Sequence, residues 1–452
     1  MFYWRRVFFV IRSSFWFLPG LMAIVAVVSA ILFAEYDFGF DGGPGFTRVS
    51  EESGMPVDSA RSILSTIAGS MITVTTLVFS MTLVAMTLVA QQLGPRIVLR
   101  FMDNRPTQIF LGLFLATFLF ALIVLVRIGY ADANGQVPNI AILLSTGLVI
   151  LSMGAIIAFI HNVASRIQAD ELVGELGNEF QAAARELVQR GADDAFASEG
   201  EASDIRELFD SHDVVRVPAQ HSGYLNVLDE QAALAFLEEN DLVARVLMHP
   251  GEFVLEGTNV LEVAMKTRKG GFDDKVVERT AAMISVLPKR TAEVTLEFEV
   301  NALTEVALRA LSPGINDPYT ARACIHRLGT GLRELLDHPG QPPVTRDGEG
   351  RIRICQHQQP FGYYCSLALR PLMNAGRDHA EVLSEIADML GSLGGMAKRQ
   401  DRRDEVRDLL DALGQTVERS DLIQADRAWV KGRLEAARYN SNADCFIQPS
   451  NS

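Results

Sequence analysis

Four long apolar stretches lie in the first part of the chain, and after them apolar and charged residues alternate at short spacing. A helix needs roughly 20 residues to cross a hydrocarbon core that is about 30 Å thick, and each stretch comes close to or exceeds that length. None contains a charged side chain, as expected because a charge at the centre of a spanning helix costs about 2.5 kcal/mol or more. The pattern predicts four transmembrane helices, at residues 15–34, 63–90, 109–126 and 140–160.

Arginines gather at the ends of the predicted spans on one side of the membrane, and the loop between the first and second spans, on the other side, is mainly acidic. They precede the first span, separate the second from the third and follow the fourth: Arg5, Arg6, Arg12, Arg96, Arg100, Arg105 and Arg166. By the positive-inside rule, both termini and everything after residue 160 are expected in the cytoplasm, with the spans in a bacterial inner membrane. Gly94-Pro95 should end the second span. Arg96, Arg100 and Arg105 are then expected at the membrane interface, where they meet anionic headgroups.

The second predicted span differs from the others in its length and its polar content. As a helix, residues 63–90 would measure about 42 Å, which exceeds the hydrocarbon thickness. Small or hydroxylated residues recur along it at helical spacing, widened by neighbouring hydroxyls: Ser62, Thr66, Gly69, Ser70, Thr73, Thr75, Thr76, Ser80, Thr82 and Thr87.

Two interpretations of this stripe remain open. Such residues let helices pack closely and bond to one another. They also line water-filled pores, where hydroxyls hydrate ions without trapping them. The span holds no Asp, Glu, Lys, Arg or His, which disfavours a proton-coupled transporter. The candidate pore-lining residues are Thr66, Ser70, Thr73, Thr76, Ser80 and Thr87.

The rest of the chain has the pattern of a mixed domain followed by helices. Strands are predicted at 214–217, 223–228, 242–248 and 253–263, and helices at 161–190, 229–239, 272–286, 302–311 and 319–336. Apolar faces at 382–393, 406–417 and 428–434 predict helical hairpins, with Gly394-Gly395 ending the first helix.

The fold class is therefore an α-helical membrane protein with four transmembrane helices and cytoplasmic termini, followed by a mixed α+β cytoplasmic domain that ends in helical hairpins. The expected divisions are a transmembrane domain at 1–161, a helical connector and linker at 162–202, an α+β domain at 203–340, a mainly helical subdomain at 341–440 and a disordered tail at 441–452.

Net charge and motif content reduce the number of possible functions. The net charge of −14 disfavours nucleic acid as a partner, because phosphates need Lys and Arg to displace their counterions. The cysteines form no CxxC pair, the histidines form no HExxH pair, and no Walker or Rossmann glycine loop is present. We therefore expect no metal, no cofactor and no enzymatic activity.

One segment carries a family resemblance. The run from Ala307 to Ala321 reads ALRALSPGINDPYTA. Together with His221–Tyr224, the turn at 250–257, the loop at 96–106 and the four-span layout, it resembles the bacterial predicted membrane proteins known as domain of unknown function 2254. This chain departs from the family after Arg290-Thr291, where VTLEFE replaces an acidic, aromatic segment. The resemblance implies a membrane protein and nothing about its activity.

The motif itself has two interpretations. Ser312-Pro313-Gly314 should end one helix, and Asp317 or Thr320 should cap the next, which gives a rigid corner that packs the domain. Alternatively, Arg309, Ser312, Asn316 and Asp317 form a polar pocket for a ligand or cation.

The preferred function is a homo-oligomeric inner-membrane channel or pore-like transport protein, whose cytoplasmic domain forms a vestibule or regulatory part. Its partners would be the lipid bilayer, other copies of the chain, and ions or small solutes. The alternative is a membrane-anchored sensor or scaffold whose cytoplasmic domain binds a small ligand or a protein. A membrane enzyme ranks third.

Overall fold

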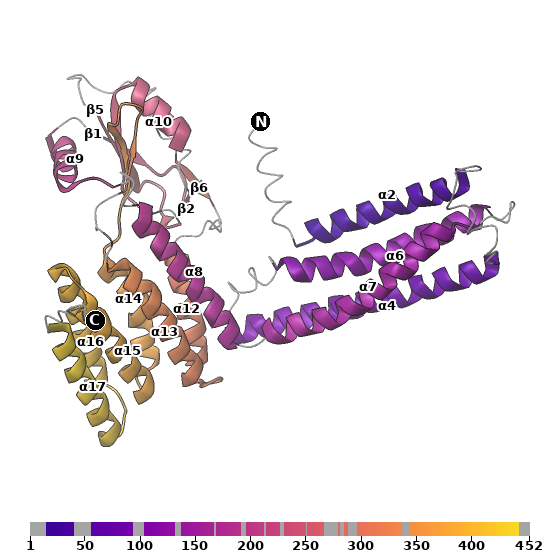
Figure 1. Cartoon of the computed structure of the whole chain (residues 1–452). Coiled ribbons are helices and arrows are strands. Elements are labelled where there is room, and N and C mark those ends of the chain that lie inside the picture. Colours follow the sequence, from indigo (N-terminus) through magenta and orange to yellow (C-terminus); the bar gives the residue numbers. More distant parts are fainter. Residues whose placement is uncertain are drawn as a thin grey trace, which may run out of the picture. The chain divides into compact units, whose positions relative to one another are not determined.

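The chain forms two compact units, Met1–Leu172 and Val173–Ser452, which we call the membrane unit and the C-terminal unit (Figure 1). The computed structural model describes residues 15–39, 56–93, 104–131, 137–166, 169–190, 196–211, 214–226, 230–249, 251–265, 279–280, 284–287, 296–336, 338 and 343–442.

The described residues of the membrane unit include four helices long and apolar enough to cross a membrane, which confirms the four predicted apolar helices. They are α2 (Phe17–Gly39), α4 (Val57–Leu93), α6 (Arg105–Ala131) and α7 (Asn139–Arg166). Helices α4, α6 and α7 extend beyond their predicted apolar stretches at both ends, and α2 does so at its C-terminal end. A helix continues into flanking polar residues until a breaker or loop stops it. For α4, the last helical residue is Leu93, directly before Gly94-Pro95.

Helix α6 is the centre of the membrane unit, because α2, α4 and α7 all pack against it. It is also the most apolar of the four, with a mean hydropathy of 3.0. One polar contact ties it to α7: the buried hydroxyls of Thr117 and Ser152 lie 3.1 Å apart. A second joins Asn162 Nδ2 to Thr107 Oγ1 at 3.3 Å. Such paired hydroxyls are the usual polar contacts between membrane helices.

The sequence predicts a helix from residue 161 to 190. The structure describes the end of α7 and helix α8 (Ala169–Arg190) in this range, and residues 167–168 between them lie outside the described residues. Gly177 and Gly174 do not end α8. Within the C-terminal unit, α8 packs on α13 (Pro318–Leu335). The ring of Phe180 lies where a side chain at Gly331 would be, so glycine is required for this close approach. Gln181 Nε2 donates to Glu334 at 2.8 Å beside it.

A five-stranded mixed sheet forms one part of the C-terminal unit, in the order β1-β5-β3-β8-β7. Only the β3–β8 pair is parallel among the pairs described. The strands are β1 (Val214–Pro218), β3 (Leu242–Val246), β5 (Asn259–Met265), β7 (Val344–Arg346) and β8 (Ile352–Cys355). Strands β7 and β8 come from the segment expected to be mainly helical. They are too short for a periodic signal, and the strand that pairs with β8 on its other side, β3, lies far away in the sequence.

Two helices cover the two faces of this sheet. Leu237 of α10 (Glu230–Glu239) joins a core with Leu242 and Ala244. Phe209 of α9 (Glu199–Ser211) joins a core on the other face with Val243. Successive strand residues point to opposite faces, so β3 and β5 must be apolar at nearly every position.

A smaller antiparallel sheet has the order β4-β2-β6, formed by β2 (Gly223–Asn226), β4 (Phe253–Val254) and β6 (Ser285–Leu287). Strand β6 corrects the prediction of a helix over 272–286, at least for its last residues. Val286 pairs with Leu225, and the gain from that non-local pairing overrides local helix propensity. The remainder of that predicted helix lies largely outside the described residues.

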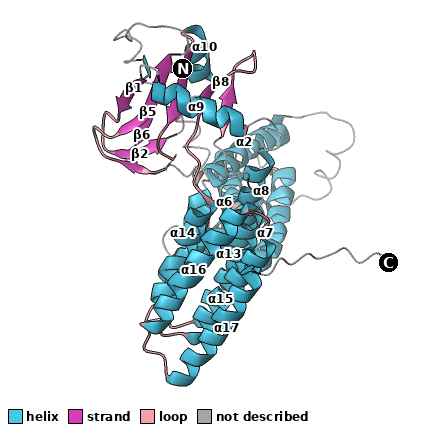
Figure 2. Cartoon of the chain, turned by 90° about the vertical axis from the view of Figure 1, so that its left-hand side faces the viewer, coloured by secondary structure: helices cyan, strands magenta, loops and turns pink. Residues whose placement is uncertain are grey.

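The other part of the C-terminal unit is a set of helices that lie side by side (Figure 2). The family motif lies between α12 (Leu296–Ala310) and α13. Four more helices follow strand β8 in the sequence: α14 (Phe361–Ala375), α15 (Ala380–Met396), α16 (Gln400–Glu418) and α17 (Gln424–Asn442). The predicted helical character of this region is confirmed.

Helix α15 does not stop at Gly394-Gly395, as the sequence suggests, but continues to Met396. A side chain at Gly391 would lie 2.8 Å from the Cβ of Ala437, and one at Gly394 would lie 2.5 Å from the Cβ of Ser441. These glycines therefore let α17 approach α15 closely. Packing, and not chain termination, explains them.

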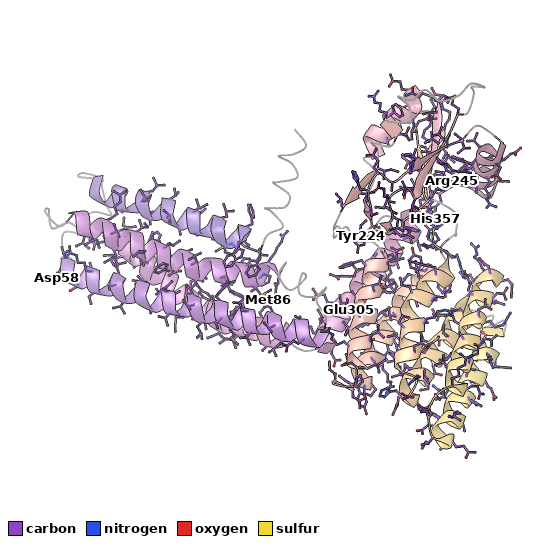
Figure 3. All side chains as sticks on the ribbon, turned by 180° about the vertical axis from the view of Figure 1, so that it is seen from behind. Asp58, Met86, Tyr224, Arg245, Glu305 and His357 are labelled. Atoms are coloured by element: carbon purple, nitrogen blue, oxygen red, sulfur yellow. The ribbon has the colours of Figure 1, made fainter. Side chains whose placement is uncertain are left out.

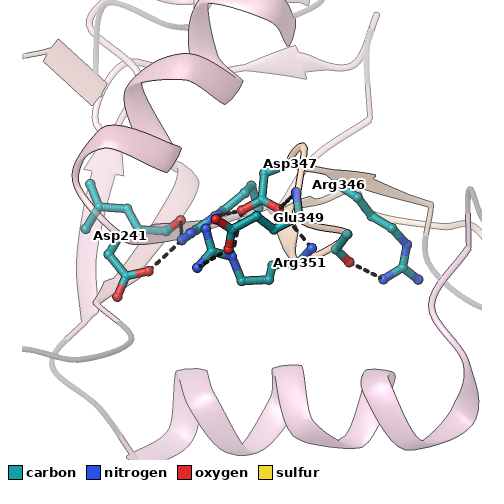
Figure 4. Close-up of polar contacts among 8 residues, drawn as sticks. Asp241, Arg346, Asp347, Glu349 and Arg351 are labelled. Carbon is teal, nitrogen blue, oxygen red and sulfur yellow. Dashed lines mark hydrogen bonds and ion pairs between the residues drawn. The ribbon is translucent and has the colours of Figure 1, made fainter.

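A buried arginine anchors the edge of the larger sheet. Arg353 on β8 is 1% exposed and donates from Nε to Asp347 at 2.9 Å and from Nη1 to Asp241 at 2.9 Å. Arg351 and two backbone amides also donate to Asp347 (Figure 4). Burial alone would raise the pKa of Asp347, but these hydrogen bonds outweigh it and hold the pKa well below its usual range. Asp347 is therefore a charged, fully paired group at the end of the sheet.

Replacing Arg353 with Met should destabilise the protein by about 3–5 kcal/mol, because Asp347 is left buried without its main partner. The measurement is thermal unfolding of the purified full chain in detergent, followed by circular dichroism. Arg351→Met is the matched control: Arg351 binds the same carboxylate but is 41% exposed, so the loss should be about 1 kcal/mol or less. Equal losses for the two variants would contradict the assignment of Arg353 as the anchor.

Candidate functional site

The hydroxyl stripe of α4 lies on the side of the helix that faces away from the other described helices of the membrane unit. The residues that pack inward recur at heptad spacing and include Ala60, Leu64, Met71, Val78, Ala85 and Val89. At 3.6 residues per turn, the centre of the stripe lies about half a turn around the helix from these residues. The six candidate pore-lining residues are all exposed: Thr66, Ser70, Thr73, Thr76, Ser80 and Thr87.

Packing within one protomer therefore does not explain the stripe. Among the hydroxyl residues that the sequence analysis singles out, Thr82 is buried and Thr75 is half-buried. The interhelical hydroxyl contact described above is made by Thr117 and Ser152, which belong to α6 and α7. The sequence could not separate these roles, because Ser and Thr serve both.

The hydroxyls of the stripe bond to their own helix. Thr66, Thr73, Thr76 and Thr87 donate to the carbonyl four residues earlier, at 2.7–3.0 Å. Each hydroxyl oxygen keeps lone pairs that can accept from water or contact a cation. The exposed face thus carries a row of weak oxygen acceptors without a formal charge. Figure 3 labels Asp58 and Met86, which lie near the two ends of this helix.

The predicted interface arginines are only partly described. Arg105 is exposed in the first turn of α6. Arg96 and Arg100 lie outside the described residues, so their placement stays a prediction.

The family motif forms the tight connection between α12 and α13. The amide of Asn316 donates to Ser312 O at 2.8 Å, and the amide of Asp317 donates to Ala310 O at 2.8 Å. Asn316 has a φ of 51°, in the left-handed region that Asn tolerates better than most residues. This backbone geometry explains the Asn-Asp order in front of Pro318.

The polar groups of the motif are largely used within this turn. Asp317 caps α13: one carboxylate oxygen accepts from the amides of Tyr319 and Thr320, and the other accepts from the Thr320 hydroxyl at 2.6 Å. The Ser312 hydroxyl donates to Arg309 O at 2.6 Å. The geometry thus favours the packing corner, and a ligand or cation pocket at these residues stays a prediction. Ile315 and Tyr319 point outward beside the turn and are 43% and 78% exposed.

Replacing Asp317 with Ala should destabilise the protein by about 0.5–2 kcal/mol through the loss of the helix cap. Asn316→Gly should change stability by about 0.5 kcal/mol or less, because glycine accepts the same φ without strain. Thermal unfolding of both variants checks the pair. Unchanged stability for Asp317→Ala would show that its carboxylate does not act as a cap.

A buried polar group that the sequence did not indicate lies where the end of β3, the start of α12 and the start of α14 meet. His249 Nδ1 is 4.0 Å from Glu297 Oε1, which also accepts from the Tyr364 hydroxyl at 3.3 Å. The ring of His357 lies 5.2 Å from that of His249; Figure 3 labels His357 in the C-terminal unit. No described group of His, Cys, Asp or Glu is arranged to hold a metal ion. These residues are far apart in sequence, so no spacing could reveal them.

Two histidines in this unit are held neutral. Burial, reinforced by His357, lowers the pKa of His249 from 6.5 to about 4. Burial, reinforced by Arg402 and Arg399, lowers the pKa of His338 from 6.5 to about 4. In the unfolded chain both titrate near the ordinary value, so acid favours unfolding. Their stabilising effect is complete above pH 6.5 and is lost as the pH falls toward 4.

The apparent melting temperature should therefore fall between pH 6.5 and pH 4, and His249→Asn should flatten that dependence. The measurement is a series of melting curves of the full chain across this range. His221→Asn is the control, since His221 is exposed and should leave the slope unchanged. A slope that is the same in His249→Asn and in the unmodified protein would contradict the inference.

Comparison with known proteins adds a family but no activity. Residues 12–392 match the family model described as "Predicted membrane protein (DUF2254)". The chain is 26% identical over 390 residues to uncharacterized proteins of Mycobacterium tuberculosis (Rv1290c, strain H37Rv) and Mycobacterium bovis (Mb1321c). The matched region covers 85% of this chain and 73% of each relative. No solved structure matches the chain.

Proposed function

Because the chain belongs to the DUF2254 family of predicted membrane proteins, we propose from its own geometry that it is a homo-oligomeric channel or pore-like transport protein, with α4 lining the conduit. The observation that supports this proposal is the exposed hydroxyl face of α4, opposite the face that packs within the membrane unit. A helix whose outer face met only lipid would have no use for this concentration of hydroxyls. Apolar side chains at those positions would favour lipid more strongly.

The length of α4 supports the same proposal. Its 37 residues measure about 55 Å, well beyond a hydrocarbon core of about 30 Å. Only one charged residue, Arg61, lies inside it beyond the first turn. A lining helix that continues past the membrane surface can form the wall of a vestibule, whereas a lipid-facing helix of this length would have to tilt strongly.

An assembly of several copies follows from the number of helices. The three described helices that pack around α6 leave no conduit among themselves, since the centre is filled by α6 side chains such as Phe114, Phe120 and Val124. The hydroxyl face of α4 can border water only if α4 helices of different copies surround a common axis. A closed ring with rotational symmetry is the arrangement that meets this requirement.

The proposed setting is the bacterial inner membrane, with both termini and the C-terminal unit in the cytoplasm. The arginines that flank the apolar spans support this orientation through the positive-inside rule. The C-terminal unit would then form a vestibule or regulatory part below the pore. The alternative function is a membrane-anchored sensor or scaffold, in which α4 helices only hold the copies together.

Liposomes that hold only the purified protein should release ions, and Thr76→Val should change the rate of that flux. Thr75→Val is a closely matched control, because both threonines donate to the carbonyl four residues earlier, but Thr75 is half-buried on the inward side. The flux should therefore be unaffected by Thr75→Val. An equal effect of both variants would point to helix distortion rather than to a lining role.

A second readout separates a pore from a lipid-facing or scaffold surface. Thr76→Cys should react quickly with a charged, water-soluble thiol reagent, and Ile72→Cys, one helical turn away, should not. Ile72 is 41% exposed and lies about a quarter turn around the helix from the centre of the stripe. The described native cysteines, Cys324, Cys355 and Cys365, are buried and should stay unlabelled. Absence of flux together with an unreactive Thr76→Cys would overturn the channel proposal and favour the scaffold.

A further inference from the structure

A cavity of about 300 Å³ lies between α14 and α16 in the helical part of the C-terminal unit. It is lined by two segments, one at the C-terminal end of α14 and one at the C-terminal end of α16. The lining residues are Arg370, Met373, Asn374, Arg377, Ala412, Gln415, Thr416 and Arg419. Six of these eight residues are polar, and three of the six are arginines. This cavity is separate from the family motif and from α4.

The arginines of this cavity are not neutralised by the surrounding carboxylates. Arg370 and Arg419 form no ion pair with any residue in the described part of the chain, and Arg377 has only a 3.5 Å contact with Asp378. Two acidic residues nearby in sequence on α16 pair elsewhere: Asp411 with Arg438 and Glu418 with Lys431, both at 2.6 Å. A chain with a net charge of −14 thus keeps three positive charges together around one hollow.

Helix dipoles explain part of this arrangement but not all of it. Arg377 and Arg419 follow the C-terminal ends of α14 and α16, where a positive charge offsets the negative end of the dipole. Arg370 lies more than a turn before the end of α14, where the dipole effect has faded. Arg370, Arg377 and Arg419 are all exposed, so their guanidinium groups are open to an anion that enters the cavity from solvent.

We propose that this cavity binds a small phosphate-bearing anion. A phosphate ester carries a charge of about −1.5 to −2 at neutral pH, which suits three guanidinium groups better than a single carboxylate does. The planar guanidinium donates two parallel hydrogen bonds to phosphate oxygens. The amide groups of Asn374 and Gln415 add neutral donors at the rim.

The volume and the lining of the cavity also limit the size and chemistry of the rest of the ligand. Its volume is at the lower end of the roughly 300–1,000 Å³ range of small-molecule sites, which favours a compact ligand over a protein segment. No aromatic side chain lines it, so a nucleotide base would find no stacking surface. The ligand is recognised through its phosphate groups. The site stands independently of the proposed channel, and binding there would give the C-terminal unit a ligand to sense.

Isothermal titration of the purified full chain with inorganic pyrophosphate tests the proposal. Pyrophosphate should bind, and Arg370→Gln and Arg419→Gln should each weaken binding at least tenfold. Arg433→Gln is the matched control: Arg433 is an exposed arginine of the same helical part that pairs with Asp388, so the same charge change should leave binding unaltered. Binding should also weaken as the salt concentration rises.

Two further titrations show which kind of anion the cavity binds. Glycerol 3-phosphate, which carries the headgroup chemistry of a phospholipid, tests whether a phosphate monoester is sufficient, and citrate tests whether any polyanion binds. Arg370→Lys keeps the charge but loses the planar fork and should bind with intermediate affinity. Pyrophosphate that fails to bind, citrate that binds equally well, or Arg370→Gln and Arg433→Gln that behave alike would each overturn the proposal. In the last case the arginines serve only the helix ends.

Discussion

The packing of three helices against α6 is the constraint on which the membrane unit depends. Helix α6 is the most apolar span, and α2, α4 and α7 each bury one face on it. Lipid supplies no hydrophobic drive for this association, so close packing and the Thr117–Ser152 contact hold the helices together. Once α4 has committed one face to α6, its opposite face must meet something outside the protomer. That face is the one with the hydroxyls, and the proposed function rests on this geometry.

The C-terminal unit is organised by a different constraint, the placement of buried charge. Arg353 and Asp347 lie at the sheet edge with almost no exposure, and each is tolerated only because the other and its neighbours complete the hydrogen bonds. Glu262 on β5 is held in a similar way by Arg216 and Arg245 from the strands on either side. In the arginine-lined cavity, Arg370 and Arg419 form no ion pair within the described part of the chain, and the nearby Asp411 and Glu418 pair with other partners. This difference between paired charges in the sheet and arginines without an ion-pair partner in the cavity is the reason to propose an anion site there.

The family motif illustrates how a recognisable sequence can have a structural role. Its most distinctive residues, Asn316 and Asp317, are fixed by a left-handed turn and a helix cap. The two hydrophobic residues beside them, Ile315 and Tyr319, are left exposed. The hydroxyl stripe shows the opposite case. Its Ser and Thr residues form only a loose sequence pattern, but they remain candidates for a functional role because they are exposed and do not pack inside the membrane unit. Neither outcome follows from the sequence pattern, since the same residue types suit both roles.

The sequence by itself determined the four apolar helices, the end of α4 and the helical C-terminal region, and it narrowed the cap of α13 to Asp317 or Thr320. These features depend on local properties: apolar length, helix periodicity and turn chemistry. Only the tertiary structure decided that β7 and β8 complete a sheet begun at β1, that Gly391 and Gly394 admit α17, and that the hydroxyl face of α4 points away from α6. The cavity with Arg370 and Arg419 likewise joins residues from two helices. Such features arise from contacts between distant segments, and their energies are absent from any local window of the chain.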